Sequence, residues 1–494
     1  MPEHFISRSE AETDLASAAA YIAESIMSAD GRAEAMTAVV PLYLERGDVD
    51  TAAELANMVD DTYTRDRLLT LVAEKCAHVD DDEYALQLAE AVEDAGLKAQ
   101  AFERIGIVKA SKGQIEKAHE IAAEIAHPDF VHAESAVNQA VSGNFDAAHA
   151  ILEQIDYPSA KVHALLEIAS AAITSGDGEV AAKELSQATT AAAEIEHNEE
   201  RIRSFIDIGN LLTEANRKDL AIETFDKATA DAEALDNIHR DSFLASAAVG
   251  LFHAGSLERA DRALDLVADK TQTASCLLGY AREYWRSDER TDAMDALEEA
   301  YAILKSQRES ETRSSKARYG LFTSIAAQFA GFEKGERAIE IAHAIEDDEE
   351  RTSALTQVAE ILTARKEDDL ARHALHDIAE DADRTFALIR MSDAKSKNGD
   401  ADGARETLNE ALHMVESVPQ LSARSSAYNE IAKRFAASGD GERASEATAL
   451  NLETIASIRD QSTRVTAVAG AAEVYGAGAE LPAAFAPGIS KLLI

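Results

Sequence analysis

Apolar residues recur along this chain with the period of an amphipathic helix, and short polar turns separate the helical stretches. The clearest example covers residues 161–195. Four apolar residues in its first half fall at spacings i, i+3, i+4 and i+7, which places them on one helix face: Leu165, Ile168, Ala169 and Ala172. Gly176 can end this helix in a left-handed backbone conformation, and an alanine-rich helix follows it. The segment is therefore predicted to form a helical hairpin.

The hairpin pattern recurs through most of the chain. Ala181 lies five residues after Gly176, where the second helix is expected to cross close to the first. A turn placed five residues before each equivalent alanine gives thirteen turns: Gly47, Asp80, Gly113, Gly143, Gly176, Asn216, Gly255, Asp288, Glu333, Lys366, Gly399, Gly439 and Gly478. The commonest interval is 33 residues, and the longer ones mostly add about two helical turns. A single hairpin cannot bury its apolar face alone, so about thirteen hairpins are predicted to stack.

The pattern divides the chain into three parts. Residues 1–29 are expected to hold a capping helix, residues 30–475 the repeat array, and residues 476–494 a half-repeat or a tail. Apolar residues make up 46% of the 494 residues but aromatic residues only 5%, so the core must consist of Ala, Leu, Ile and Val. Proline is scarce, with 7 residues, and glycine falls mostly in turns, so few positions interrupt a helix. The predicted fold class is all-α.

Several hairpins resemble the tetratricopeptide repeat, in which a large residue precedes Leu-Gly in the first helix and Ala-x3-Phe marks the second. The matching segments are Phe102-x2-Ile105-Gly106, Phe205-x2-Ile208-Gly209 followed by Ala221-x3-Phe225, and Tyr428-x2-Ile431-Ala432-x2-Phe435. The Trp of the pattern is never present, its small residue is more often Ala than Gly, and its closing Pro is mostly missing. The array is thus similar to a divergent member of the family, and a related class of helical-hairpin solenoid is the alternative assignment. The resemblance implies a right-handed superhelical solenoid of about 13 repeats, with first helices lining a concave face.

Charge and composition narrow the classes of partner. The chain has 48 basic and 91 acidic residues, a formal net charge of −43, which argues against nucleic acid or an anionic membrane surface as the main partner. An acidic surface in which Lys is rarer than Arg is typical of halophilic proteins, although an ordinary acidic scaffold is the alternative. No apolar run is long enough to span a membrane, and the N-terminus does not look like a leader, so the expected location is cytoplasmic. Cys76 and Cys276 are expected to be two buried thiols.

The sequence contains no recognisable catalytic or cofactor motif. The sequence has no His-x3-His or Cys-x2-Cys pair of the kind that binds a metal, and it has no Gly-x4-Gly-Lys-Ser/Thr loop. His373 and His376 share a helix face but lack a third ligand, so we expect them at the surface. We therefore predict no catalytic residue, no metal and no cofactor, and we expect that the protein is not an enzyme.

Two groups of residues stand out on the predicted first-helix faces. The eighth hairpin offers Arg282, Trp285 and Arg286, which combine the one Trp of the chain with two guanidinium groups, residue types that are enriched at binding hot spots. The alternative is that Trp285 fills a gap between repeats while the arginines pair with acids of the next hairpin. In the twelfth hairpin, Asn429 and Lys433 resemble the positions that grip carboxylates in peptide-binding tetratricopeptide proteins, and a structural role is again the alternative.

Two further segments differ from the repeat. One is a basic run, which either docks an acidic partner or pairs with acids of the array itself: Lys305, Arg308, Arg313, Lys316 and Arg318. The other is the C-terminal segment, which is rich in Ala, Gly and Pro and ends with apolar residues, as a capping half-repeat or a self-association tail would.

The predicted function is a non-catalytic scaffold that binds a peptide, an extended segment or a protein subunit on the concave face. This prediction depends partly on the resemblance in fold. The alternatives are a self-assembling structural component, which would associate through the C-terminus, and a small-ligand sensor or enzyme that uses the cleft near Arg282 and Trp285.

Overall fold

The computed structural model describes residues 4–307, 315–475 and 481–493. Within these ranges the chain forms 28 α-helices and one short 3₁₀ helix, and no β-strand. The all-α prediction is confirmed. None of the helices in the described part of the chain combines the length and the apolar character that a membrane span requires.

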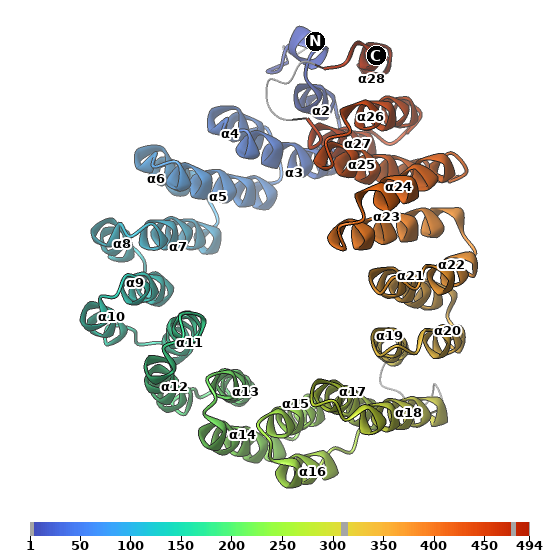
Figure 1. Ribbon diagram of the computed structural model, residues 1–494. Helices are drawn as coiled ribbons and strands as arrows, with labels where there is room; N and C mark the ends of the chain where they lie inside the picture. Colours follow the sequence, from blue (N-terminus) through green and yellow to red (C-terminus); the bar gives the residue numbers. More distant parts are fainter. Residues whose placement is uncertain (1–3, 308–314, 476–480, 494) are drawn as a thin grey trace. The chain divides into compact units, whose positions relative to one another are not determined.

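Most of the helices pair as hairpins, each with a first and a second helix (Figure 1). Twelve hairpins follow one another in the described residues: α3 (Ala29–Glu45) with α4 (Val49–Asn57), α5 (Thr62–His78) with α6 (Asp82–Ala91), α7 (Ala95–Ser111) with α8 (Ile115–Ala122), α9 (Asp129–Val141) with α10 (Phe145–Leu152), α11 (Pro158–Thr174) with α12 (Gly178–Ala192), α13 (Asn198–Glu214) with α14 (Lys218–Glu233), α15 (Arg240–His253) with α16 (Leu257–Asp265), α17 (Lys270–Arg286) with α18 (Arg290–Ser306), α19 (Ser315–Gly331) with α20 (Gly335–His343), α21 (Asp348–Ala364) with α22 (Asp368–His376), α23 (Asp381–Lys397) with α24 (Ala401–Val415), and α25 (Leu421–Ala437) with α26 (Gly441–Ala456).

The turns between paired helices lie where the alanine spacing predicts them. The described residues with a left-handed backbone are the first twelve of the thirteen predicted turn residues, seven of them glycine and five not. The backbone φ is +81° at Gly176 and +58° at Asn216. At Gly176 the amide donates to the Ile173 carbonyl and the next amide to that of Ala172, which satisfies the end of the first helix. The thirteenth predicted turn, Gly478, lies outside the described residues.

The alanine after each turn is a core residue because the paired helices cross there. All twelve such alanines are at most 8% exposed: Ala52, Ala85, Ala118, Ala148, Ala181, Ala221, Ala260, Ala293, Ala338, Ala371, Ala404 and Ala444. Where an aromatic residue enters the core, glycine makes room for it. The ring of Phe225 on α14 is fully buried against Gly209 of α13 and Gly250 of α15. Cys76 and Cys276 are free and buried, as expected.

Arginine side chains bind the backbone of the segment that precedes several first helices. In four of them an arginine donates to the carbonyl of the aliphatic residue six positions earlier: Arg201 to Ile195, Arg351 to Ile345, Arg424 to Val418 and Arg464 to Ile458. Acids that precede a first helix also cap it, as two examples show. Asp61 accepts from the Thr64 amide at 2.8 Å and Asp347 from the Glu350 amide at 2.9 Å.

The chain divides into two compact units. Unit 1 consists of residues 1–108 and 359–494, and unit 2 of residues 109–358. Inside unit 2, the first helices α9, α11, α13, α15, α17 and α19 pack in sequence order, each against the next.

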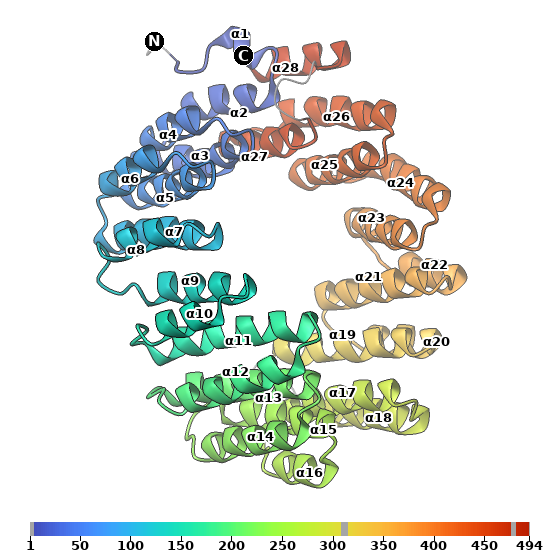
Figure 2. The ribbon, with the colours of Figure 1, turned by 60° about the vertical axis from the view of Figure 1, so that its left-hand side comes forward.

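In unit 1 the two terminal segments of the chain pack together. The capping helix predicted within residues 1–29 is divided into α1 (Arg8–Ala11) and α2 (Leu15–Glu24), because Asp14 caps a new helix there. Helix α2 packs along α27 (Gln461–Ala472) and α3, and α27 packs against α3 and α25, as Figures 1 and 2 both show. Helix α2 thus takes the position of a second helix for α27, so segments from both ends of the sequence complete one hairpin.

The C-terminal helix has a packing role in unit 1. Helix α28 (Ala486–Leu492) contacts α26 and α2, and the short 3₁₀ helix η2 (Ala483–Phe485) precedes it. The apolar side chains of Ile489, Leu492 and Leu493, which suggested a self-association tail, are buried.

Candidate binding sites on the first-helix faces

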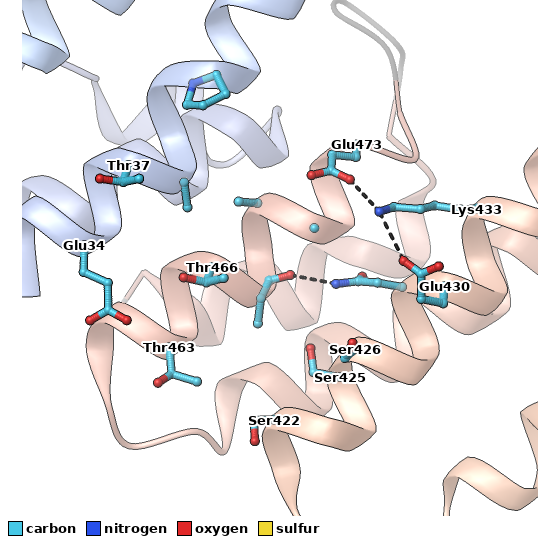
Figure 3. A pocket seen from close by; sticks show the side chains of 16 residues that line it. Glu34, Thr37, Ser422, Ser425, Ser426, Glu430, Lys433, Thr463, Thr466 and Glu473 are labelled. Carbon is cyan, nitrogen blue, oxygen red and sulfur yellow. Dashed lines mark hydrogen bonds and ion pairs between the residues drawn. The ribbon is translucent and has the colours of Figure 1, made fainter. Parts of the chain in front are cut away.

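A cavity of about 540 Å³ lies among the first helices α3, α25 and α27 of unit 1. Figure 3 shows the side chains that line it, many of which carry polar groups. Six hydroxyl groups face it: Thr37 from α3, Ser422, Ser425 and Ser426 from α25, and Thr463 and Thr466 from α27. Asn429 and Lys433, the candidate binding residues of the twelfth hairpin, also line this cavity. The α3 residues were not predicted, because nothing local in the sequence indicates that α3 lies beside α27.

Lys433 is held by two carboxylates at one end of the cavity. Its Nζ lies 3.4 Å from Glu430 Oε1 and 2.5 Å from Glu473 Oε2 (Figure 3). Burial favours a lower pKa for the Lys433 ammonium, but the bonds to Glu473 and Glu430 outweigh it and raise the pKa. Glu430 also accepts from Arg434 at 2.7 Å, and Arg434 reaches Asp393 at 2.8 Å. The Lys433 charge is therefore already neutralised within the protein.

The side chain of Asn429 is likewise engaged. It is 7% exposed, its Nδ2 donates to the Ala467 carbonyl at 3.1 Å, and its Oδ1 accepts from Asn451 Nδ2 at 2.6 Å. Gly470 faces this amide, and a Cβ at that position would lie only 2.5 Å from Asn429 Nδ2. Asn429 thus connects α25 to α26 and α27, and both groups expected to grip a carboxylate already have protein partners.

Two side chains of the cavity lining, Ser425 and Glu34, have no protein partner within the described residues. Ser425 is 1% exposed, and its Oγ makes no hydrogen bond within the described residues. Pro41 lies inside α3 and has no N–H, so the Thr37 carbonyl lacks its usual helical donor. The exposed Glu34 makes no ion pair within the described part of the chain. A proline inside a predicted helix was the one sequence signal that could have drawn attention to α3.

A smaller hollow of about 320 Å³ lies on the first-helix face of unit 2. It is formed by α13, α15 and α17, and its polar lining consists of Asn210, Ser242, Ser246, Gln272, Ser275 and Arg282. Arg282 is exposed and forms no ion pair within the described residues. Its guanidinium group is therefore available to an anionic group, unlike that of Arg286.

The three site residues predicted in the eighth hairpin point to different neighbours. The Trp285 ring stacks on Phe332 with a centroid distance of 4.2 Å, and the guanidinium of Arg290 lies 3.6 Å from the Trp285 ring centroid. Arg286 Nη1 lies 3.1 Å from Glu283 of its own helix and 3.1 Å from His253 of the preceding hairpin. Trp285 is half-buried in the joint between consecutive hairpins, and only Arg282 lines the hollow.

The basic run is partly used for packing. Arg318 is buried, donates to the Leu304 carbonyl at 3.1 Å, and lies over the Phe322 ring. Lys305 lies over the Tyr301 ring, and Lys316 is exposed. Arg308 and Arg313 lie outside the described residues.

The described residues contain no cluster of three or more His, Cys, Asp or Glu side chains that could hold a metal ion. His373 and His376 are exposed, as predicted. Burial raises the pKa of Cys76 to about 11 and that of Cys276 to about 12, which disfavours the thiolate at neutral pH.

No protein-family model matches the chain, and no curated protein matches it in sequence. Among solved structures, it is similar to Ton1535 from Thermococcus onnurineus NA1, with 17% identity over 72% of this chain and 98% of that one and a TM-score of 0.25. It is also similar to PH0952 from Pyrococcus horikoshii, a signal transduction ATPase with a tetratricopeptide repeat sensor (12% identity, 71% of this chain, 54% of that one, TM-score 0.27). A third is the Cut9-Hcn1 hetero-tetramer of the APC/C (14% identity, 88% and 89%, TM-score 0.22). The helical-hairpin fold described above rests on the structure of this chain and not on these likenesses.

Proposed function

We propose that the protein is a non-catalytic scaffold that holds a protein or peptide partner on the faces formed by its first helices. The observation that carries this proposal is the cavity among α3, α25 and α27, where polar groups without protein partners line a space of about 540 Å³. That volume falls in the range of pockets that enclose a small ligand or a few side chains. A stack of hairpins also offers a long surface for an extended segment.

The predicted residues have distinct parts in this proposal. Asn429 and Lys433 border the cavity in unit 1, and Arg282 lines the hollow in unit 2. Trp285 and Arg286 belong to the same surface but contact other protein groups, so we assign them the role of holding the joint around Arg282. The α3 residues Glu34 and Thr37 are added to the binding face.

Site-specific photocrosslinking tests the scaffold proposal. A benzophenone amino acid replaces Thr466, which is exposed at the cavity, or Glu54, which is exposed on the second helix α4. Irradiation in native lysate at high salt should attach a discrete protein to the Thr466 variant and not to the Glu54 variant. Equal labelling at the two positions, or none at either, would count against binding on the first-helix face.

A small-ligand site at Arg282 is the second candidate, because this guanidinium has no ion-pair partner within the described residues. A tripeptide with a central glutamate serves as the probe, and the nearby Trp285 reports by its fluorescence. Binding should change the emission of the parent and of the Arg262→Gln control, whose exposed arginine lies on the second helix α16, but not that of Arg282→Gln. An unchanged emission of the parent would remove this candidate.

A further inference from the structure

We infer that the cavity among α3, α25 and α27 receives a basic side chain, lysine or arginine, of the partner. This inference rests on the proposed function and specifies the chemistry of the group that is bound. It reverses the charge that the resemblance to carboxylate-gripping positions implies for Asn429 and Lys433. Three observations support it. They are the charge balance of the lining, an open hydrogen-bond acceptor, and the ion pairs that Lys433, the cation among the lining residues, already makes with protein carboxylates.

The charged groups at the cavity are mostly acidic. Three carboxylates line it, those of Glu34, Glu430 and Glu473, against the single ammonium of Lys433. Glu430 and Glu473 both contact Lys433, whereas Glu34 projects from α3 on the other side of the cavity (Figure 3). A bound carboxylate would meet like charges and would have to displace Glu430 or Glu473 from Lys433. A bound cation instead meets an uncompensated carboxylate, as electrostatic complementarity requires.

The uncharged groups also suit a hydrogen-bond donor. The Ser425 hydroxyl is buried and unpartnered, and its oxygen can accept from an N–H group of the ligand. The carbonyl of Thr37 lacks its helical donor because residue 41 is a proline. An ammonium carries three donors and a guanidinium five, with no acceptor. A basic side chain therefore supplies a donor to the open Ser425 oxygen and introduces no new acceptor.

The cavity is lined by helices that are remote from one another in the sequence. Glu34 and Thr37 belong to the first complete hairpin, while Ser425 and Thr466 belong to the last helices of the array. A ligand that contacts both sides bridges α3 to α25 and α27. Binding should therefore slow hydrogen exchange in α2, α3 and α27 within unit 1, because the bound state requires these helices to remain packed.

The test uses the full chain and three capped tripeptides, which carry lysine, the isosteric neutral norleucine or glutamate between two glycines. Calorimetric titration is made in about 1 M KCl, where the Debye length is only about 3 Å, so that nonspecific attraction to the acidic surface is screened. Two cavity variants, Glu34→Gln and Ser425→Ala, are compared with Glu54→Gln. The control removes the same charge from the exposed face of α4, also in unit 1.

We expect one lysine tripeptide to bind per chain, about tenfold tighter than the norleucine or glutamate peptide, as one charge-assisted hydrogen bond would give. Glu34→Gln should remove about this tenfold preference, Ser425→Ala should weaken lysine binding severalfold, and Glu54→Gln should leave it unchanged. Preference for the glutamate peptide, equal effects of Glu34→Gln and Glu54→Gln, or tighter binding of free cadaverine than of the peptide would overturn the inference. Crosslinking of a partner at Thr466 without any preference for lysine would refute the charge assignment and leave the scaffold proposal standing. Absence of both would refute the two together.

Discussion

The packing of Phe225 between two glycines gives the sharpest test of how these hairpins fit together. Phe225 on α14 is fully buried, and a Cβ added at either Gly209 or Gly250 would lie within 3.0 Å of its ring. Such a contact is essentially never seen for a real side-chain carbon, so something must move. The ring has little freedom to move away, because the two glycines flank it from the first helices of adjacent hairpins. Gly250→Ala should therefore force the hairpins apart or the ring out of its rotamer.

The expected change in the free energy of unfolding follows from two opposing effects. Alanine in a helix interior is favoured over glycine by about 1 kcal/mol, which would stabilise any mid-helix replacement. Overpacking a close-packed core costs about 1–3 kcal/mol. Gly320 in α19 supplies the control, because it is also inside a helix and a Cβ there would meet nothing within 4 Å. Gly320→Ala should stabilise by about 1 kcal/mol. Gly250→Ala should be less stable than this control by the overpacking cost, about 1–3 kcal/mol.

Urea unfolding followed by circular dichroism at 222 nm measures both variants, with hydrogen exchange of α13, α14 and α15 as the local readout. A long repeat array need not unfold in one step, so the local measurement decides where the loss occurs. Phe225→Leu should relieve the clash, so the combination with Gly250→Ala should lose less than the two single losses added together. If Gly250→Ala proved as stable as Gly320→Ala, the fit of Phe225 against both glycines would be refuted.

Three further predictions concern charge and the tryptophan. Burial favours a higher pKa for Asp14, but the bonds from Arg46 and Ser17 outweigh it and lower the pKa, so its stabilising effect is full above the unfolded pKa and lost as the pH falls through the folded one. Asp14→Asn should accordingly cost about 1 kcal/mol at pH 7 and progressively less below about pH 4, as acid unfolding curves of the two proteins would reveal. Trp285 is half-buried under Arg290, so acrylamide should quench its emission only partly, and full quenching would contradict its stacking on Phe332. The net charge of −43 predicts a melting temperature that rises from low to molar KCl, and a flat or falling temperature would oppose a halophilic origin.

The repeat register could be predicted from sequence because it depends on local chemistry. A helix crossing needs a small residue, and a tight turn needs a left-handed residue, so one alanine and one turn residue recur at a fixed spacing of five. Even the five turns without glycine, such as Asn216 and Lys366, follow from this spacing. The arginine that donates six residues back, as Arg201 does to Ile195, has a fixed spacing as well and could have been found in the same way.

The pairing of α2 with α27 could not be predicted, because it depends on a contact between the two ends of the sequence. Seven of the ten α2 residues are buried, which is consistent with their apolar character. The apolar character predicts that the helix is covered but does not indicate which helix covers it. The same limit applies to the cavity. The spacing of Asn429 and Lys433 located one wall, but the carboxylate of Glu473 that neutralises Lys433 lies one hairpin later, and Glu34 comes from α3.

The composite hairpin also determines how binding and stability are linked. Contacts between α27 and the helices α2 and α3 are made by segments that are remote in sequence, so forming them costs more chain entropy than forming a hairpin with a short turn. These contacts are therefore expected to open more readily than the hairpins on either side. A ligand in the cavity binds only when α3 lies against α27, so it stabilises the packed state by RT ln(1 + [L]/Kd). By the same linkage, any change that loosens the packing of α2 or α3 lowers the affinity for the ligand, even where it touches no residue of the cavity. The cavity thus lies at a place in unit 1 where occupancy can report whether α3 and α27, which are remote in sequence, are packed together.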